Sequence, residues 1–313
     1  MDLGSVRTLP TKGTIGVLAT GSPVEPNRLE IALAEIRRRG FQLEIPLDPS
    51  AYYADYRFGF ANGSADERAR AFMSLVENPS VDAIITARGG YGTLDILPRI
   101  DFGKIHAAKK VVVGMSDATA LLVQCVSKAG IFSVHGPAVA TAFADAATSE
   151  DAARSADALL CLLSDPSYRF ASDLEVIRAG GGEGRIIAGN LTMLLTLLGT
   201  PYDIDYRGVI LVLEEVGDAP FKIHRAFTQL KLAGKLDELA GLVFGRFSKC
   251  EAKFGPTVDE VIALLVSDIL RGSSYPVLRG LKFGHWGENL PLPLGCYARI
   301  KDQRFEVLES PLG

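Results

Sequence analysis

The chain has 313 residues, of which 48% are hydrophobic and 22% charged, and its formal net charge is −4. This is the composition of an ordinary globular protein, and the length allows one large or two medium domains. The slightly acidic balance, without a separate basic cluster, argues against nucleic acid or an anionic membrane surface as a partner. We therefore expect no nucleic-acid partner and no membrane partner.

The cysteines and the apolar runs indicate the cellular compartment of the protein. The four cysteines have neither C-x-x-C nor zinc-ligand spacing, which is typical of a reduced, intracellular protein. No apolar run approaches the roughly 18 residues of a membrane span. The run at 15–19 is too short for the hydrophobic part of a signal peptide. We expect a cytoplasmic protein.

The first half of the chain alternates short apolar strands with helices. A helix ending near residue 163, followed by Ser164-Asp165-Pro166, predicts a domain boundary and hence domains over 1–165 and 166–313. The alternation predicts a mostly parallel sheet with helices on both faces and a ligand site at the carboxyl edge of its strands. Strands are predicted over 14–19, 41–45, 81–87 and 111–113, and helices over 28–39, from a capping box at Ser64 and Glu67 to 77, and after 119.

The pattern beyond residue 166 is mixed. Two short strands are expected around a flexible glycine-rich turn at 180–184, and a final hairpin is expected to run through residue 307. Between them we predict helices over 190–198, 222–233 and 258–269, and strands over 209–213 and 241–244.

Ser116 lies where the predicted strand at 111–113 meets the helix after Thr119. The surrounding residues Gly114-Met115-Ser116-Asp117-Ala118 are similar to the G-x-S-x-G turn of α/β-hydrolases, with alanine in the last place. A strand-to-helix turn lifts a small polar side chain above the sheet and directs the first N–H groups of the helix toward it. Ser116 is therefore a candidate acyl-transfer nucleophile, and the alternative is an ordinary helix N-cap.

The sequence Arg88-Gly89-Gly90-Tyr91-Gly92 directly follows another predicted strand. It lacks the G-x-G-x-x-G spacing of dinucleotide sites, so we do not expect it to bind a nucleotide. We expect the protein to need no cofactor. Gly89 and Gly90 form either a tight turn that requires positive φ or a backbone that approaches a ligand oxygen closely, as in an oxyanion hole.

The four histidines, His106, His135, His224 and His285, have no paired metal-ligand spacing, so no metal site is expected. His135 is typical of a structural histidine at a strand end. His285 stands in a glycine-rich loop and is either a surface histidine or a general base.

Glu214 and Glu215 follow the strand at 209–213 and must point to opposite faces of it. Either both are solvated, or one faces the cleft at the sheet edge. A serine on a tight turn, a carboxylate at a strand end and a loop histidine together make a nucleophile, an orienting group and a base.

Seven motifs occur in the order seen in the LD-carboxypeptidases, which the sequence resembles from Ile15 to about Ala298. These serine peptidases include muramoyltetrapeptide carboxypeptidase and, as a side branch, the microcin C self-immunity hydrolases. The motifs are Ala87-Arg88-Gly89-Gly90-Tyr91-Gly92, Gly114-Met115-Ser116-Asp117-Ala118-Thr119-Ala120-Leu121, His135-Gly136-Pro137, Gly189-Asn190-Leu191, Gly199-Thr200-Pro201-Tyr202, Leu213-Glu214-Glu215-Val216-Gly217 and Phe283-Gly284-His285.

The resemblance implies a flavodoxin-like parallel-sheet domain followed by a swivelling domain of mixed β/α structure. It implies a catalytic triad of Ser116, Glu214 and His285, with an oxyanion hole from the backbone N–H groups of Gly90 and Asp117. Members of the family are typically homodimers.

The implied substrate is a murein tetrapeptide from which the terminal D-Ala is released, in cytoplasmic peptidoglycan recycling. Arg88, Tyr91 and Trp286 are the residues expected to contact it, although Arg88 is equally suited to a structural brace and Trp286 to a loop anchor. Two alternatives remain: an immunity-type hydrolase of aminoacyl-nucleotide conjugates, and a non-catalytic peptide- or sugar-binding protein.

Overall fold

The computed structural model describes residues 3–51, 60–285 and 287–313. The chain divides into two compact units: Met1–Tyr168 with Gly287–Gly295 and Ser310–Gly313, and Arg169–Trp286 with Cys296–Glu309. The segments 287–295 and 310–313 thus belong to the first unit, whereas the predicted boundary at 165/166 assigns them to the second domain. The division into functional domains over 1–165 and 166–313 therefore stays a prediction.

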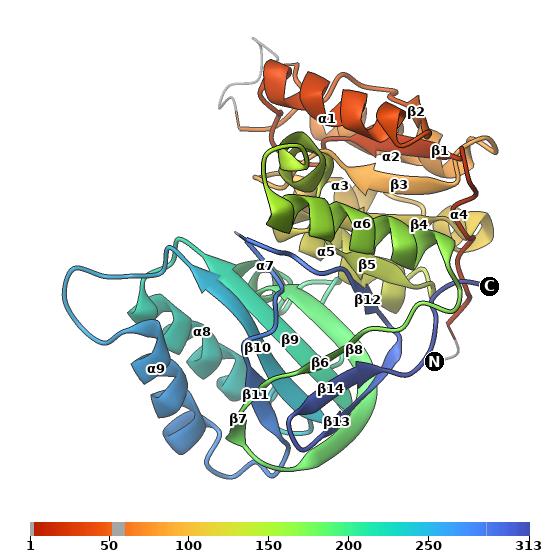
Figure 1. The fold of residues 1–313 in the computed structure, drawn as a ribbon. Coiled ribbons are helices and arrows are strands. Elements are labelled where there is room, and N and C mark those ends of the chain that lie inside the picture. Colours follow the sequence, from red (N-terminus) through yellow and green to blue (C-terminus); the bar gives the residue numbers. More distant parts are fainter. Residues whose placement is uncertain (1–2, 52–59, 286) are drawn as a thin grey trace. The chain divides into compact units, whose positions relative to one another are not determined.

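The first unit is built on a six-stranded sheet with the order β12-β5-β4-β3-β1-β2 (Figure 1). Apart from β12, which pairs antiparallel with β5, its strands are parallel. The order 2-1-3-4-5 is that of flavodoxin-like folds, so the predicted fold of this part is confirmed. The strands are β1 (Thr14–Leu18), β2 (Gln42–Glu44), β3 (Ala83–Thr86), β4 (Val111–Gly114), β5 (Ser133–His135) and β12 (Leu292–Leu294).

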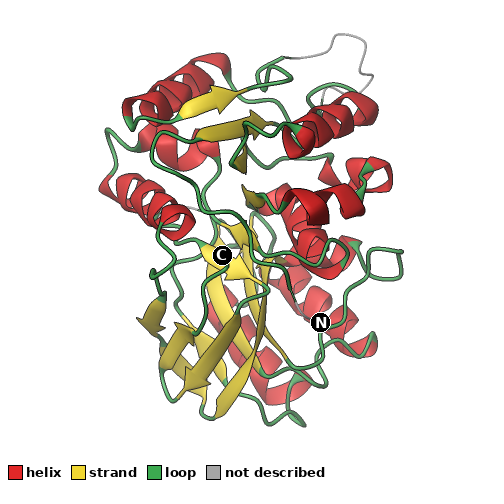
Figure 2. Ribbon diagram, turned by 90° about the vertical axis from the view of Figure 1, so that its right-hand side faces the viewer, coloured by secondary structure: helices red, strands yellow, loops and turns green. Residues whose placement is uncertain are grey.

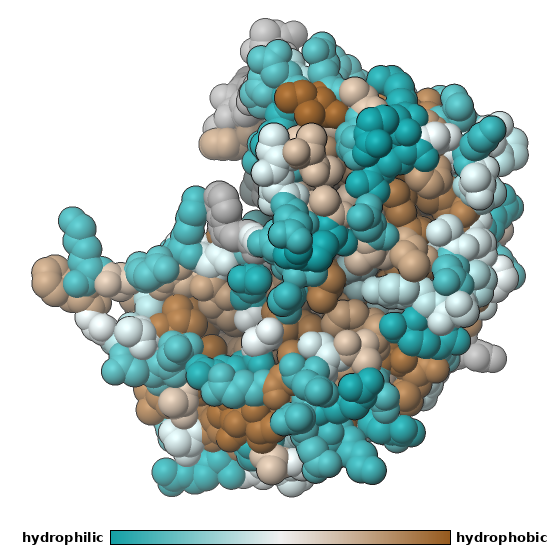
Figure 3. Space-filling view, viewed as in Figure 1, coloured by the Kyte–Doolittle hydropathy of each residue, from teal (hydrophilic) through white to brown (hydrophobic). Residues whose placement is uncertain are grey.

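Helices cover both faces of this sheet (Figure 2). Helix α2 begins with the predicted capping box, in which Ser64 and Glu67 exchange hydrogen bonds. Hydrophilic side chains gather over α6 (Figure 3), where Arg154 pairs with Glu150. The helices of the unit are α1 (Pro26–Arg38), α2 (Ala65–Glu77), α3 (Thr93–Ile96), α4 (Phe102–Ala108), α5 (Thr119–Ser127) and α6 (Glu150–Ser164), with short turns at Leu97–Arg99, Ser116–Ala118 and Val139–Phe143.

The second unit contains an eight-stranded sheet of order β6-β14-β13-β8-β9-β10-β11-β7. The four central strands β8 to β11 are parallel and the outer pairings are antiparallel, which confirms the predicted mixed β/α structure. Its strands are β6 (Ala171–Asp173), β7 (Glu175–Arg178), β8 (Gly181–Asn190), β9 (Val209–Val216), β10 (Gly241–Ser248), β11 (Val277–Arg279), β13 (Tyr297–Lys301) and β14 (Arg304–Val307). Its helices are α7 (Leu191–Thr196), α8 (Pro220–Leu232) and α9 (Val258–Leu264), which continues into a wider turn at Leu265–Ile269.

The prediction of a flexible turn at 180–184 is wrong. Residues from Gly181 onward form the start of the long strand β8, and β7 pairs with β11 instead of β8. A Cβ atom at Gly182 would collide with the carbonyl of Ala240, and one at Gly184 with the carbonyl of Gly208. These glycines therefore let the neighbouring backbone approach the strand closely, and close approach of backbone is a known reason for glycine inside a strand.

Within residues 3–51, 60–285 and 287–313, no helix is both long and apolar enough to cross a lipid bilayer.

Candidate active site

Ser116 is held in a strained backbone conformation between β4 and α5. Its φ is +59°, in the left-handed region that residues other than glycine rarely adopt. The helical turns that begin here have no side-chain cap, so the interpretation of Ser116 as an ordinary N-cap is not supported. A strained serine between a strand and a helix has the geometry of the nucleophile turn in α/β-hydrolases.

Small residues allow this turn to pack tightly. A Cβ atom on Gly114 would lie 2.7 Å from the Cβ atom of Ala118 and 2.7 Å from Oγ1 of Thr86. Likewise, a Cβ atom on Gly89 would lie 2.6 Å from the Cβ atom and 2.9 Å from Oγ of Ser116. The glycine at position 89 therefore brings the backbone of the Arg88–Gly92 turn against the side chain of Ser116.

Asp117 connects the same two turns. Its side chain is 3% exposed, and Oδ2 accepts a hydrogen bond of 2.8 Å from the backbone N–H of Thr93. Burial raises the pKa of the Asp117 carboxyl above its ordinary value, against the hydrogen bonds from Thr93 and Gly92 and the positive charge of Arg68. The residue after the candidate nucleophile thus fixes the end of the glycine-rich turn.

Arg68 was not identified from the sequence. Its side chain is fully buried, and its guanidinium donates to the carbonyl oxygens of Thr20 and Gly92, the latter at 2.6 Å. A Cβ atom on Gly92, whose φ is +124°, would lie 2.7 Å from this guanidinium. The Arg68 side chain therefore supports the Arg88–Gly92 turn from the protein interior. No local sequence pattern distinguishes Arg68 from a surface arginine on α2.

The glycine-rich turn itself exposes residues that were predicted to contact substrate. Gly90 has φ of +113°, so the positive φ expected of this turn is found there. Arg88 is exposed and donates from Nη1 to the carbonyl of Pro23 at 3.1 Å, which supports a bracing role. Tyr91 is 57% exposed. Trp286 lies outside the described residues.

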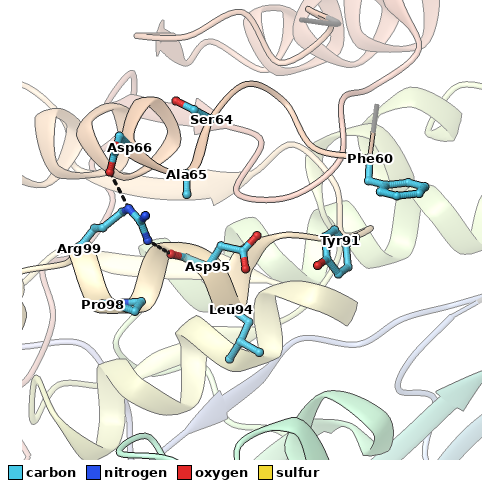
Figure 4. A pocket seen from close by; sticks show the side chains of 9 residues that line it. All are labelled: Phe60, Ser64, Ala65, Asp66, Tyr91, Leu94, Asp95, Pro98 and Arg99. Carbon is cyan, nitrogen blue, oxygen red and sulfur yellow. Dashed lines mark hydrogen bonds and ion pairs between the residues drawn. The ribbon is translucent and has the colours of Figure 1, made fainter. Parts of the chain in front are cut away.

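Tyr91 stands at one end of a groove of about 1080 Å3 in the first unit (Figure 4). Its ring meets that of Phe60 edge to face, with centroids 5.9 Å apart. At the other end of the groove Arg99 forms an ion pair with Asp66 at 2.5 Å. The groove thus extends from the glycine-rich turn toward a charged rim.

In the second unit, Glu214 and His285 form a carboxylate–imidazole pair. The Nδ1 atom of His285 lies 2.6 Å from Oε2 of Glu214, whose side chain is completely buried. The backbone N–H of His285 donates to the same oxygen at 3.3 Å, and its carbonyl accepts from Oγ of Ser248 at 2.7 Å. A Cβ atom on Gly284 would lie 2.6 Å from the Cβ atom of Glu214. The interpretation of Glu214 as solvated is therefore wrong, whereas His285 is partly exposed and is held by Glu214.

The pair changes the basicity of the imidazole. Burial alone favours the neutral ring, but the hydrogen bond and charge of Glu214, together with the charge of Glu215, outweigh it and raise the pKa of His285. A carboxylate that holds one ring nitrogen leaves the other nitrogen to act as a base.

Glu215 points to the opposite face, as the alternation predicted, and has a structural role. It is 3% exposed, and Oε2 accepts from the backbone N–H of Thr192 at 2.9 Å. Its Oε1 accepts from Nδ2 of Asn190 at 2.9 Å, while Oδ1 of Asn190 accepts from the backbone N–H of Met193. The two side chains together cap the start of α7.

Asn289, in the segment 287–295 of the first unit, lies beside the serine turn. The backbone N–H of Asn289 donates to Oγ of Ser155 at 2.9 Å, and its Nδ2 lies 3.5 Å from Sδ of Met115. Asn289 is 5% exposed. An ordinary asparagine in a loop has no sequence signal that would have identified this contact.

A strained serine on a strand-to-helix turn and a buried carboxylate–imidazole pair are the parts from which serine hydrolases are built. Comparison with known proteins gives the family. The models of the LD-carboxypeptidase N-terminal domain and C-terminal domain match residues 15–136 and 183–300. The chain belongs to the LD-carboxypeptidase family and is a carboxypeptidase of the serine type.

Individual relatives cover almost the whole chain. It is similar to the probable murein peptide carboxypeptidase of Bacillus subtilis, with 29% identity over 95% of this chain and 92% of that protein. It is also similar to the microcin C7 self-immunity protein MccF of Escherichia coli, with 27% identity over 92% of this chain and 90% of that protein. A solved structure of muramoyltetrapeptide carboxypeptidase from Oxalobacter formigenes has a TM-score of 0.81 and 28% identity, and covers 94% of this chain and 97% of its own. A structure of MccF has a TM-score of 0.88 and 25% identity, and covers 99% of this chain.

Proposed function

We propose that the chain releases the terminal D-Ala from murein tetrapeptides by way of an acyl-enzyme. The hydrogen bond between His285 and the buried Glu214 carries this proposal, because it prepares an imidazole to act as a base. The names of the relatives from Bacillus subtilis and Oxalobacter formigenes support a murein peptide as the substrate class.

In the proposed triad, Ser116 is the nucleophile, His285 the general base and Glu214 the orienting carboxylate. His285 stands four residues before Asn289 in the chain. An extended chain covers at most about 3.6 Å per residue, so the Cα atoms of these two residues can be no more than about 14 Å apart. Because Asn289 contacts Met115, the neighbour of Ser116, this short tether supports bringing His285 to the serine.

The proposed oxyanion hole consists of the backbone N–H groups of Gly90 and Asp117. The close approach of Gly89 to Ser116 and the hydrogen bond from Thr93 to Asp117 support it, since both hold the glycine-rich turn against the serine. Loss of one such donor typically costs about 2.7–4 kcal/mol of transition-state stabilisation.

The proposed chemistry has two steps. Oγ of Ser116 attacks the carbonyl carbon of the bond before the D-residue as His285 takes its proton. The C–N bond then breaks, and His285 returns the proton to the leaving amine of D-Ala. Water, deprotonated by His285, hydrolyses the ester and restores the serine.

Further proposals concern the substrate contacts and the assembly of the protein. Arg88, Tyr91 and Trp286 are proposed substrate contacts, and for Tyr91 the support is its exposure at the mouth of the groove. We infer a cytoplasmic homodimer that acts in peptidoglycan recycling. The four free cysteines support the cytoplasmic location. The family resemblance supports the homodimer and the role in peptidoglycan recycling.

A second candidate is an immunity-type hydrolase of aminoacyl-nucleotide conjugates. The likeness to MccF, with a TM-score of 0.88, favours this second candidate. The family model and the relative from Bacillus subtilis are, by contrast, both named as carboxypeptidases.

The test is release of free D-Ala from a purified murein tetrapeptide, run beside the Ser116→Ala variant and an aminoacyl sulfamoyl adenosine. Release by the wild-type protein alone supports the carboxypeptidase. Cleavage of the nucleotide conjugate without release of D-Ala supports the immunity-type function. Full D-Ala release by folded Ser116→Ala would overturn the triad.

A further inference from the structure

We propose that Arg246 binds the terminal carboxylate of the peptide substrate, beside the Glu214–His285 pair. The proposal rests on the proposed carboxypeptidase function and adds to it the group that recognises the end of the peptide. It follows from a β-bulge, from the contacts of the loop that carries His285, and from an arginine that forms no ion pair with any carboxylate of the described residues.

The bulge lies where the central strands β9 and β10 of the second unit run side by side (Figure 1). Phe244 is paired with Leu213, and Phe247 is paired with Glu215. The pairing therefore advances three residues along β10 for two along β9. One extra residue is inserted in β10, so Gly245 and Arg246 together stand opposite Glu214.

This register determines the face on which Arg246 lies. Side chains of a regular strand alternate between faces, so Phe244 and Phe247, three positions apart, would normally be on opposite faces. Here both pair with residues of one face, and their ring centroids are 5.9 Å apart. The phenylalanine face is covered by α8, where Phe227 contacts Phe244. The bulge therefore places Arg246 on the other face, that of Glu214, and re-aiming a side chain is a common use of bulges near active sites.

The loop that carries His285 is attached to the same bulge. The backbone N–H of Arg246 donates to the carbonyl of Phe283 at 2.8 Å. A Cβ atom on Gly245 would lie 2.7 Å from that carbonyl oxygen, so the glycine allows the loop to rest on the strand. Ser248, two residues after Arg246, holds the carbonyl of His285. Arg246 and the proposed base are thus positioned by one short stretch of β10.

The charge of Arg246 has no counterpart within the described part of the chain. The residue is half-buried, and its Nε atom is buried without a hydrogen-bond partner among the described residues. No described carboxylate forms an ion pair with the guanidinium. Arg88, by contrast, donates to the carbonyl of Pro23. A buried N–H without an acceptor is unfavourable, and a carboxylate offers a guanidinium two oxygens in a matching planar geometry.

The chemistry of a carboxypeptidase identifies which carboxylate this is. The leaving group is an amino acid whose amine receives the proton from His285 and whose carboxylate is attached to the next carbon. A cation next to the proposed base therefore lies on the leaving-group side of the scissile bond. Recognition of the terminal carboxylate there restricts cleavage to the last residue of the peptide.

The experiment compares a tetrapeptide with a free terminal carboxylate and the same peptide ending in an amide. In Arg246→Gln we expect kcat/KM for the free acid to fall by about 10- to 150-fold, the loss typical of a hydrogen bond to a charged group, with the slow cleavage of the amide changed less than about threefold. Arg246→Lys should recover part of the loss, because it restores the charge without the paired geometry. Arg37→Gln, which removes an exposed arginine of α1, is the matched control and should behave as wild type.

An equal loss on the acid and the amide in Arg246→Gln would overturn the proposal, because it would indicate a general structural defect. The readout is kept separate from turnover by measuring binding of both peptides to Ser116→Ala by calorimetry. A preference for the acid that disappears in Ser116→Ala/Arg246→Gln supports the carboxylate site even if wild-type protein releases no D-Ala. A preference that persists in the double variant overturns it, whatever the outcome for the proposed function.

Discussion

The buried carboxylate of Glu214 and the imidazole of His285 are joined by a hydrogen bond of 2.6 Å from Nδ1 to Oε2. The side chain of His285 remains 20% exposed, while that of Glu214 is completely enclosed. The pair is therefore fixed on its carboxylate side and accessible on its imidazole side. This asymmetry is what a general base requires, because it sets the tautomer without blocking the nitrogen that takes the proton.

Glu214→Gln should reduce kcat by about 10²- to 10⁴-fold without unfolding the protein, because the amide keeps the shape but stabilises neither the required tautomer nor the imidazolium. Steady-state release of D-Ala checks the rate, and circular dichroism checks the fold. A variant with more than about a tenth of wild-type kcat would contradict the assignment of Glu214.

The pH dependence of kcat/KM should change in the same variant. The base works in its neutral form, and Glu214 raises the pKa of His285, so the acid limb of the wild-type profile should lie above the ordinary histidine value. Removing the carboxylate leaves burial, which lowers the pKa of His285, and the smaller opposing effect of the Glu215 charge, so the acid limb should move to lower pH. A limb that stays in place in Glu214→Gln would show that His285 is not the group that titrates.

The strained backbone at Ser116 predicts that two inactive variants, Ser116→Gly and Ser116→Ala, differ in stability. Glycine adopts φ near +59° without steric penalty, whereas alanine does not. After subtraction of the extra unfolded-state entropy of glycine, Ser116→Gly should be more stable than Ser116→Ala by about 0.5–1 kcal/mol. Urea unfolding of the two variants measures the difference. Equal free energies of unfolding would mean that the turn relaxes when the hydroxyl is removed.

Gly89→Ala should separate the glycine-rich turn from the serine. The new Cβ atom would lie 2.6 Å from the Cβ atom of Ser116, so one of the two turns must move. We expect kcat to fall at least about 100-fold, since oxyanion donors act only at the correct distance, and stability to fall by about 1–3 kcal/mol from overpacking. Gly272→Ala is the control, because no heavy atom lies within 4 Å of its Cβ position. Near-normal D-Ala release by Gly89→Ala would argue against Gly90 as a donor.

The sequence predicts those parts of the molecule whose signals are local. The first sheet follows from short apolar runs alternating with amphipathic helices, and the turn at Ser116 follows from one such junction. Alternation along β9 shows that Glu214 and Glu215 face opposite sides, but not which of them meets a histidine. That choice depends on the loop ending at His285, which lies 71 residues farther along the chain.

The features that sequence analysis missed depend on contacts between distant segments. Strand β12 returns to the first sheet to pair with β5, and nothing in its own short apolar run indicates that partner. Arg68 is buried because carbonyl groups of separate loops surround it, which its helix does not reveal. The glycines before Ile186 fit a turn as well as they fit a strand approached by other backbone, and only the neighbouring carbonyls decide between the two.

Asp117 should act as a positioning residue through its side chain. Its buried carboxylate accepts from Thr93 at 2.8 Å, and a Cβ atom on Gly21 would lie 2.5 Å from the same oxygen, so three segments meet at one acceptor. Asp117→Ala would leave the N–H of Thr93 without its acceptor, and we expect the free energy of unfolding to fall by about 1–3 kcal/mol. Because the glycine-rich turn would then be held less firmly, kcat should fall by about 10- to 100-fold while KM changes less than about threefold.

Asp101→Ala provides the control for this effect. Asp101 is exposed and accepts from the backbone N–H of Lys104 at 3.1 Å as the N-cap of α4, so its removal should cost about 0.5–2 kcal/mol without a change in kcat. Asp117→Asn, which keeps one acceptor oxygen, should fall between wild type and Asp117→Ala in kcat. If Asp117→Ala and Asp101→Ala lose stability alike and both keep wild-type kcat, the carboxylate of Asp117 stabilises the fold but does not position the turn for catalysis.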